Sequence, residues 1–105
     1  MEFKVGDRIK FKSEKQSYRI CAADERFAVC IKPFNLRKTT IYTIVDLERG
    51  VRGPDNRIFC EGYETDEDAE RALKQLQSGE IEVSHRSSRY LDLDIEKIIP
   101  QKQAA

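Results

Sequence analysis

The strongest strand signal in the chain is a run of β-branched and aromatic residues between Thr40 and Leu47. Such residues favour a pleated, half-buried strand over a helix. One alternating set contains Ile41 and Val45, and the other contains Tyr42 and Ile44. Because both sets contain apolar residues, the pattern predicts a central strand that is covered on both faces for part of its length.

A dense polar stretch follows, from Gly50 to Arg57. Gly53 tolerates a positive φ, Pro54 has a fixed φ, and the side chains of Asp55 and Asn56 can bond their own backbone. These residues predict a turn. Apolar residues resume immediately afterwards, so the whole unit is expected to be a long hairpin.

Shorter apolar alternations predict the other strands. In the second of them, Tyr18, Ile20 and Ala22 are expected to share one face. The expected strand segments are 3–12, 18–23, 26–32, 81–84 and a closing segment that begins at Leu91.

One helix is expected, from about Asp66 to Ser78. Thr65 is a good N-cap, and acids fill the first turn, where the helix dipole favours them. Gly79 provides a left-handed stop. The apolar positions repeat with helical spacing: Ala69, Ala72, Leu73 and Leu76.

These elements predict a mainly β fold of the α+β class, a small antiparallel, SH3-like, partly open barrel of five to seven strands with one helix. The opening Val5-Gly6-Asp7 is typical of the entry to such barrels. At 105 residues, the chain is expected to form one β-rich domain over residues 1–100. Residues 101–105 are expected to be a frayed tail.

Composition narrows the classes of function. Lys+Arg and Asp+Glu both number 19, and this balance argues against a dedicated non-specific nucleic-acid binder, although a local basic patch is compatible with it. Cys21, Cys30 and Cys60 have no paired spacing, so we expect buried thiols in a reducing cytosol. With one histidine and no C-x-x-C motif, no metal site is expected. No signal peptide or membrane span is predicted.

The sequence offers binding groups rather than catalytic ones. His85 is the only side chain that titrates near neutrality without perturbation, and no nucleophile elbow or phosphate-binding loop accompanies it. We therefore expect no enzyme and no cofactor. Two charged corners, one after Gly50 and one after Ser84, are either solvated turns or a recognition site. The candidate ligand-binding residues are Tyr42, Arg49, Arg52, Asn56, His85, Arg86 and Arg89.

Two blocks of the sequence, together with the opening Val5-Gly6-Asp7, resemble a group of small bacteriophage and prophage proteins. One block is the run 42–46 with Gly50, the run 52–54, Asn56 and Phe59, and the other is the run 84–86 with Leu91, Leu93 and Ile95. Phage proteins of this size often act as accessory or anti-defence factors. The resemblance therefore implies a stoichiometric inhibitor, or a sponge that sequesters a signalling nucleotide, in the cytoplasm of a bacterial host.

The leading hypothesis is a non-enzymatic protein that captures a small nucleotide-like anion or a host protein, as a homo-oligomer. On this hypothesis, Arg52→Ala and His85→Ala abolish capture without changing the melting temperature. One alternative is an interaction domain without a ligand site. Another is an SH3-like nucleic-acid-binding module, and its contact residues would be Lys4, Arg8, Lys10, Lys12 and Arg19.

Overall fold

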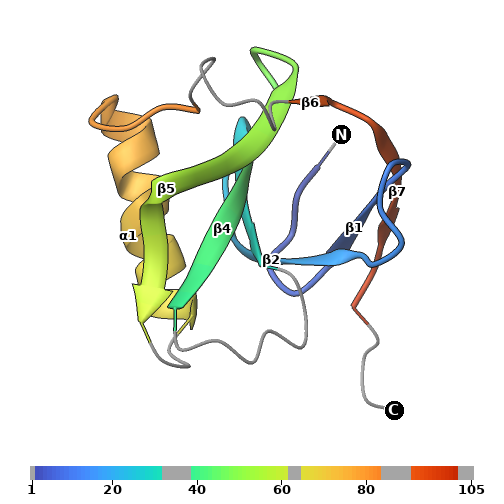
Figure 1. Ribbon diagram of the computed structural model, residues 1–105, viewed down its shortest axis with the longest axis horizontal. Helices are drawn as coiled ribbons and strands as arrows, with labels where there is room; N and C mark the ends of the chain where they lie inside the picture. Colours follow the sequence, from blue (N-terminus) through green and yellow to red (C-terminus); the bar gives the residue numbers. More distant parts are fainter. Residues whose placement is uncertain (1, 32–38, 62–64, 84–90, 102–105) are drawn as a thin grey trace.

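The computed structural model describes residues 2–31, 39–61, 65–83 and 91–101. They form an antiparallel sheet and one α-helix (Figure 1). The elements are β1 Arg8–Phe11, β2 Tyr18–Ala23, β3 Phe27–Ile31, β4 Thr39–Asp46, β5 Val51–Glu61, α1 Thr65–Ser78, β6 Leu91–Asp92 and β7 Ile95–Ile99. This part of the chain contains no helix with the length and apolarity needed to cross a membrane.

The sheet curls into a partly open barrel. Its strand order is β6-β5-β4-β3-β2-β1-β7, so the two last strands of the chain lie at opposite edges. The residues between them bond next to β5 and β1, the neighbours of the two edge strands: the N–H of Leu93 donates to the carbonyl of Gly50 at 3.2 Å, and the N–H of Lys12 donates to the carbonyl of Asp94 at 2.8 Å. The predicted fold class, a small α+β barrel with one helix, is confirmed.

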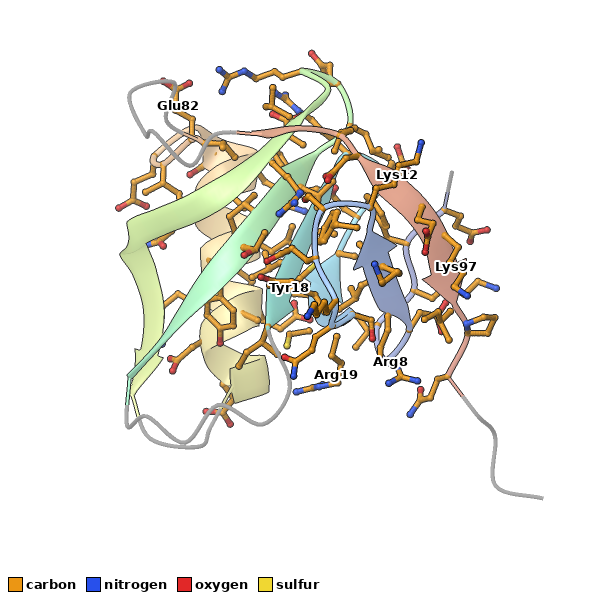
Figure 2. All side chains as sticks on the ribbon, turned by 45° about the vertical axis from the view of Figure 1, so that its right-hand side comes forward. Arg8, Lys12, Tyr18, Arg19, Glu82 and Lys97 are labelled. Carbon is orange, nitrogen blue, oxygen red and sulfur yellow. The ribbon has the colours of Figure 1, made fainter. Side chains whose placement is uncertain are left out.

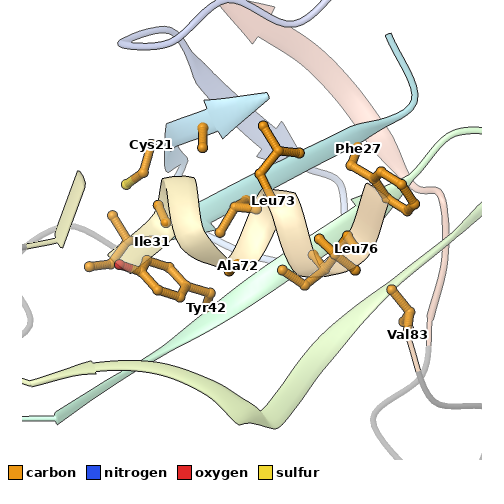
Figure 3. Close-up of a cluster of buried hydrophobic side chains, with 12 residues drawn as sticks. Cys21, Phe27, Ile31, Tyr42, Ala72, Leu73, Leu76 and Val83 are labelled. Atoms are coloured by element: carbon orange, nitrogen blue, oxygen red, sulfur yellow. The ribbon is translucent and has the colours of Figure 1, made fainter. Parts of the chain in front are cut away.

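Two apolar clusters lie on the two faces of the sheet. The first is packed between α1 and the sheet, and it includes Tyr42, Ile44 and Leu73 (Figure 3). The second lies inside the curl, and it includes Phe11 and Val45. Since neighbouring residues of β4 enter different clusters, the prediction of a central strand covered on both faces is confirmed.

The expected face of Ala22 was wrong. The pairing of β2 with β3 shifts between Ile20 and Ala22, and such a bulge changes the phase of the alternation. Ile20 therefore lies inside the curl, whereas Ala22 joins Cys21 on the helix side.

The expected polar turn from Gly50 to Arg57 was also wrong. The turn occupies residues 47–50 and ends at Gly50, whose φ is +68°. Val51 then begins β5, which runs through the Gly-Pro-Asp-Asn sequence. The β4–β5 pairing shifts register beside Pro54, which lies opposite Thr43. A bulge is a place where a strand accepts proline, so the turn-forming residues here bend a strand instead of ending one.

The helix and its end match the sequence prediction. α1 ends at Ser78, and Gly79 follows with a φ of +79°. The strand expected at 81–84 was wrong over its described part, because residues 81–83 form no strand. Val83 is nevertheless buried in the helix-side cluster, with Ile81 packed against it. At the other end of the chain, the N–H of Gln101 donates to Asp7 at 2.9 Å, and residues 102–105 lie outside the described part.

Candidate functional site

Tyr42 is a core residue. Its side chain is fully buried at the centre of β4, and its ring packs among the residues of the helix-side cluster (Figure 3). A ligand at the surface cannot stack on a ring with no exposed area. The expectation that Tyr42 offers a binding surface is therefore corrected to a packing role.

Arg52 is buried as well, with 4% of its surface exposed. Its Nε donates to Asp94 Oδ1 at 2.9 Å, and its Nη2 donates to Ser13 Oγ at 3.0 Å. Its Nη1 donates to Glu14 Oε2 at 3.4 Å. We call Ser13, Glu14, Arg52 and Asp94 the closing network, because these residues join β5 to the segments that close the barrel. Arg52 is thus a structural cation and is not available to a ligand.

Groups around the closing network stabilise the cation of Arg52 and shift the pKa values of Asp94 and Tyr18. The guanidinium of Arg52 lies 3.8 Å from the centre of the Phe11 ring, over its face, an arrangement that attracts a cation. Burial alone would raise the pKa of Asp94, but hydrogen bonds from Arg52 and Ser13 outweigh it and lower the pKa to about 2. The hydroxyl of Tyr18 donates to Glu14 at 2.8 Å, and burial together with this contact raises the pKa of Tyr18 to about 12.

Arg49 lies on the β4–β5 turn, and Asp46 organises that turn. The buried carboxylate of Asp46 accepts two hydrogen bonds from Arg26, at 2.9 and 3.0 Å. It also accepts from the backbone N–H groups of Glu48 and Arg49, at 3.1 and 3.2 Å. Desolvation opposes ionisation, yet these donors lower the pKa of Asp46. The turn therefore has a defined shape from which the Arg49 side chain extends.

The β4–β5 turn meets both ends of the segment that carries the second charged corner. Nη1 of Arg49 donates to the carbonyl of Val83 at 2.9 Å. Val83 is the last described residue before that segment. After it, β6 pairs with the start of β5, where Leu91 lies opposite Arg52. His85, Arg86 and Arg89 lie outside the described residues. Asn56 belongs to β5, and its side chain is also outside the description.

Three of the cations from the nucleic-acid alternative come together. Arg8, Lys10 and Arg19 lie on the outer face of β1 and β2, as the strand registers require. Sequence reasoning missed a fourth member, Lys97 of β7, which lies directly opposite Lys10. Its position depends on how β7 pairs with β1, and no local pattern around Lys97 indicates that pairing.

Metal-ligand clusters and thiols can be assessed within the described residues. Within the described ranges, no three His, Cys, Asp or Glu side chains gather where they could hold a metal ion. Cys21 and Cys30 are buried free thiols, and burial raises the pKa of Cys30 above that of an ordinary thiol. A thiol of this kind is a poor nucleophile, because the thiolate is the reactive form. The side chain of Cys60 lies outside the description.

The chain matches no protein-family model, no curated protein and no solved structure. Its function must therefore be inferred from its own residues and their geometry.

Proposed function

We propose that the protein is a non-enzymatic binding protein that captures a small nucleotide-like anion. The site is the corner where the β4–β5 turn meets the two ends of segment 84–90. The supporting observation is that the described residues on both sides of this segment, Val83 and Leu93, hydrogen-bond to Arg49 and Gly50 of that turn. Residues that flank the second charged corner thus contact the β4–β5 turn, more than thirty residues away in the sequence.

The residue types at this corner suit a phosphate-bearing ligand. Arginine binds phosphate through a planar fork of donors, and histidine adds a further donor when it is protonated. Tyr42 and Arg52 no longer belong to the proposed contact set, because both are buried. Asn56 lies within β5 and not in the turn at residues 47–50, so it also leaves the set. The remaining set is Arg49, His85, Arg86 and Arg89.

The resemblance to small phage and prophage proteins supports a particular use of such a site. A protein that holds a signalling nucleotide without altering it acts as a sponge in the bacterial cytoplasm, at one ligand per site. Small-molecule sites in short chains are often shared between subunits, so we propose a homo-oligomer. A stoichiometric inhibitor of a host protein would use the same corner as a protein contact.

Native mass spectrometry of protein purified from an infected host extract tests this proposal. We expect a co-purifying small mass with the wild type and with Arg71→Ala, a substitution at an exposed position of α1 that should preserve the fold. We expect its loss with Arg86→Ala and with His85→Ala. An intact partner chain in place of the small mass would support the inhibitor, whereas bare protein in every sample would contradict ligand capture.

A further inference from the structure

The outer face of β1 places cations directly opposite cations. Arg8 lies opposite Arg19 of β2, and Lys10 lies opposite Lys97 of β7. We call these four residues the basic face. Directly opposed residues of an antiparallel pair have Cβ atoms about 4.5–5.5 Å apart, and like charges at that distance are destabilising. The fold therefore maintains a repulsive arrangement although acids and bases are equal in number along the chain.

The basic face is open to solvent. α1 packs against β2, β3 and β5, and it lies on the opposite side of the molecule from β1 and β7 (Figure 1). Arg8 and Lys97 are exposed, and Lys10 and Arg19 are partly exposed. Figure 2 shows Arg8, Arg19 and Lys97 on this side of the molecule, far from Glu82.

Among the described residues, acids neutralise little of the charge of Arg8, Lys10 and Lys97. Nζ of Lys10 donates to the carbonyls of Phe11 and Glu14, and it lies 4.0 Å from Glu96. Within the described part of the chain, neither Arg8 nor Lys97 forms an ion pair. Elsewhere the fold places acids beside its cations: Arg26 forms an ion pair with Asp46, and Arg52 forms an ion pair with Asp94.

We propose that the basic face binds the phosphate backbone of a nucleic acid. Alternate residues of a strand are spaced by about 6.6–6.8 Å, and neighbouring strands by about 4.8 Å. The four cations therefore form an extended array on the outer face of β2, β1 and β7, which Lys12, also exposed, continues beyond the end of β1. An extended array of cations suits a polymer of repeated negative charges better than a single small anion. Contacts of this kind are independent of base sequence.

This surface differs from the corner of the proposed function, because the two share no residue. Charge reversal of the basic face should leave small-ligand capture intact, and variants of the corner should leave nucleic-acid binding intact. Failure of one proposal is therefore distinguishable from failure of the other.

Fluorescence anisotropy with labelled duplex and single-stranded DNA of random sequence tests the inference. The variant is Arg8→Glu/Lys97→Glu, and the control is Arg71→Glu/Lys74→Glu, which makes the same charge change on exposed positions of α1. Wild-type affinity should fall as salt rises from about 50 to about 200 mM. The face variant should bind at least about tenfold more weakly, with a salt slope smaller by about 2 for two lost phosphate contacts. The control should bind like the wild type.

Three results would overturn the inference. The first is an absence of wild-type binding to both nucleic acids at low salt. The second is an equal loss of affinity in the face variant and the helix control, which would indicate net charge rather than a site. The third is salt-sensitive self-association by sedimentation that disappears in the face variant, which would assign the surface to a second copy of the chain. The neutral variant Arg8→Gln/Lys97→Gln should show an intermediate loss, and circular dichroism confirms that each variant is folded.

Discussion

Arg52 and Asp94 are 42 residues apart in the sequence and joined by a hydrogen bond of 2.9 Å from Nε to Oδ1. Arg52 lies near the start of β5, and Asp94 lies between β6 and β7, the strands at the two edges of the sheet. The contact therefore links one wall of the barrel to the segment that closes it. It also explains why Arg52 is buried, although arginine is a residue type that often binds ligands.

Replacing Arg52 should destabilise the fold. In Arg52→Ala, the carboxylates of Asp94 and Glu14 lose a buried partner, and the face of the Phe11 ring loses its cation. We expect a loss of about 2–4 kcal/mol in the free energy of unfolding, measured by urea denaturation. Exposed Arg71→Ala should change it by less than about 0.5 kcal/mol. An unchanged unfolding midpoint in Arg52→Ala would mean that the closing network contributes little.

The closing network should make stability depend on acid pH. The pKa of Asp94 is about 2 in the folded chain and near 3.8 otherwise. The unfolded chain therefore binds a proton first as the pH falls, and the stabilisation present above about pH 4 is lost as the pH approaches 2. Asp94→Asn should reduce this pH dependence, whereas Glu80→Gln, an exposed carboxylate after α1, should keep it. Thermal melts between pH 5 and pH 2 measure the difference.

Tyr42 should behave as a core residue. Tyr42→Ala leaves a cavity against α1, next to residues such as Leu73, and we expect a loss of about 3–5 kcal/mol in the free energy of unfolding. Leu73→Ala, on the other side of the same cluster, should also destabilise, by about 2–5 kcal/mol. Normal stability combined with lost ligand capture in Tyr42→Ala would instead return this ring to the binding site.

Relieving the repulsion on the basic face should raise stability. Arg8→Glu places a carboxylate opposite Arg19, which converts a like-charge pair into an opposite-charge pair. We expect a gain of about 0.2–1 kcal/mol in the free energy of unfolding at low salt, with Arg8→Ala in between. Denaturant melts at low and high salt measure this, and the gain should shrink as salt screens the charges. A loss of stability in Arg8→Glu would show that Arg8 makes a favourable contact in the fold.

Local patterns in the sequence predicted the elements whose formation depends on local forces. The helix sequence has a threonine at its start, an acidic first turn and a glycine stop, and these signals lie within one stretch that ends at Gly79. β4 has an uninterrupted strand composition. The one strong local signal that misled is the Gly-Pro-Asp-Asn sequence after Arg52, because pairing with β4 overrides turn propensity and places Pro54 at a register shift.

The candidate binding residues could not all be predicted, because their surroundings depend on contacts between residues that are far apart in the sequence. From the sequence alone, Arg52 was interpreted as a ligand-binding residue because no partner for it is visible nearby. Its partner, Asp94, lies far along the chain, in a segment where the alternation predicts a solvated strand face. The opposition of Lys10 and Lys97 depends on the register of β1 and β7. A sequence pattern gives the residue types at a surface, whereas the pairing of distant strands decides which of them are buried, neutralised or left facing solvent.

Native mass spectrometry of protein from infected host extract tests the central claim most directly, because it detects a captured ligand whatever the identity of that ligand. The proposed function predicts a small co-purifying mass on the wild type that is absent from Arg86→Ala and retained by Arg71→Ala and by Arg8→Glu/Lys97→Glu. A wild-type protein that carries no such mass, and gains none when incubated with a panel of mono- and dinucleotides, would contradict it.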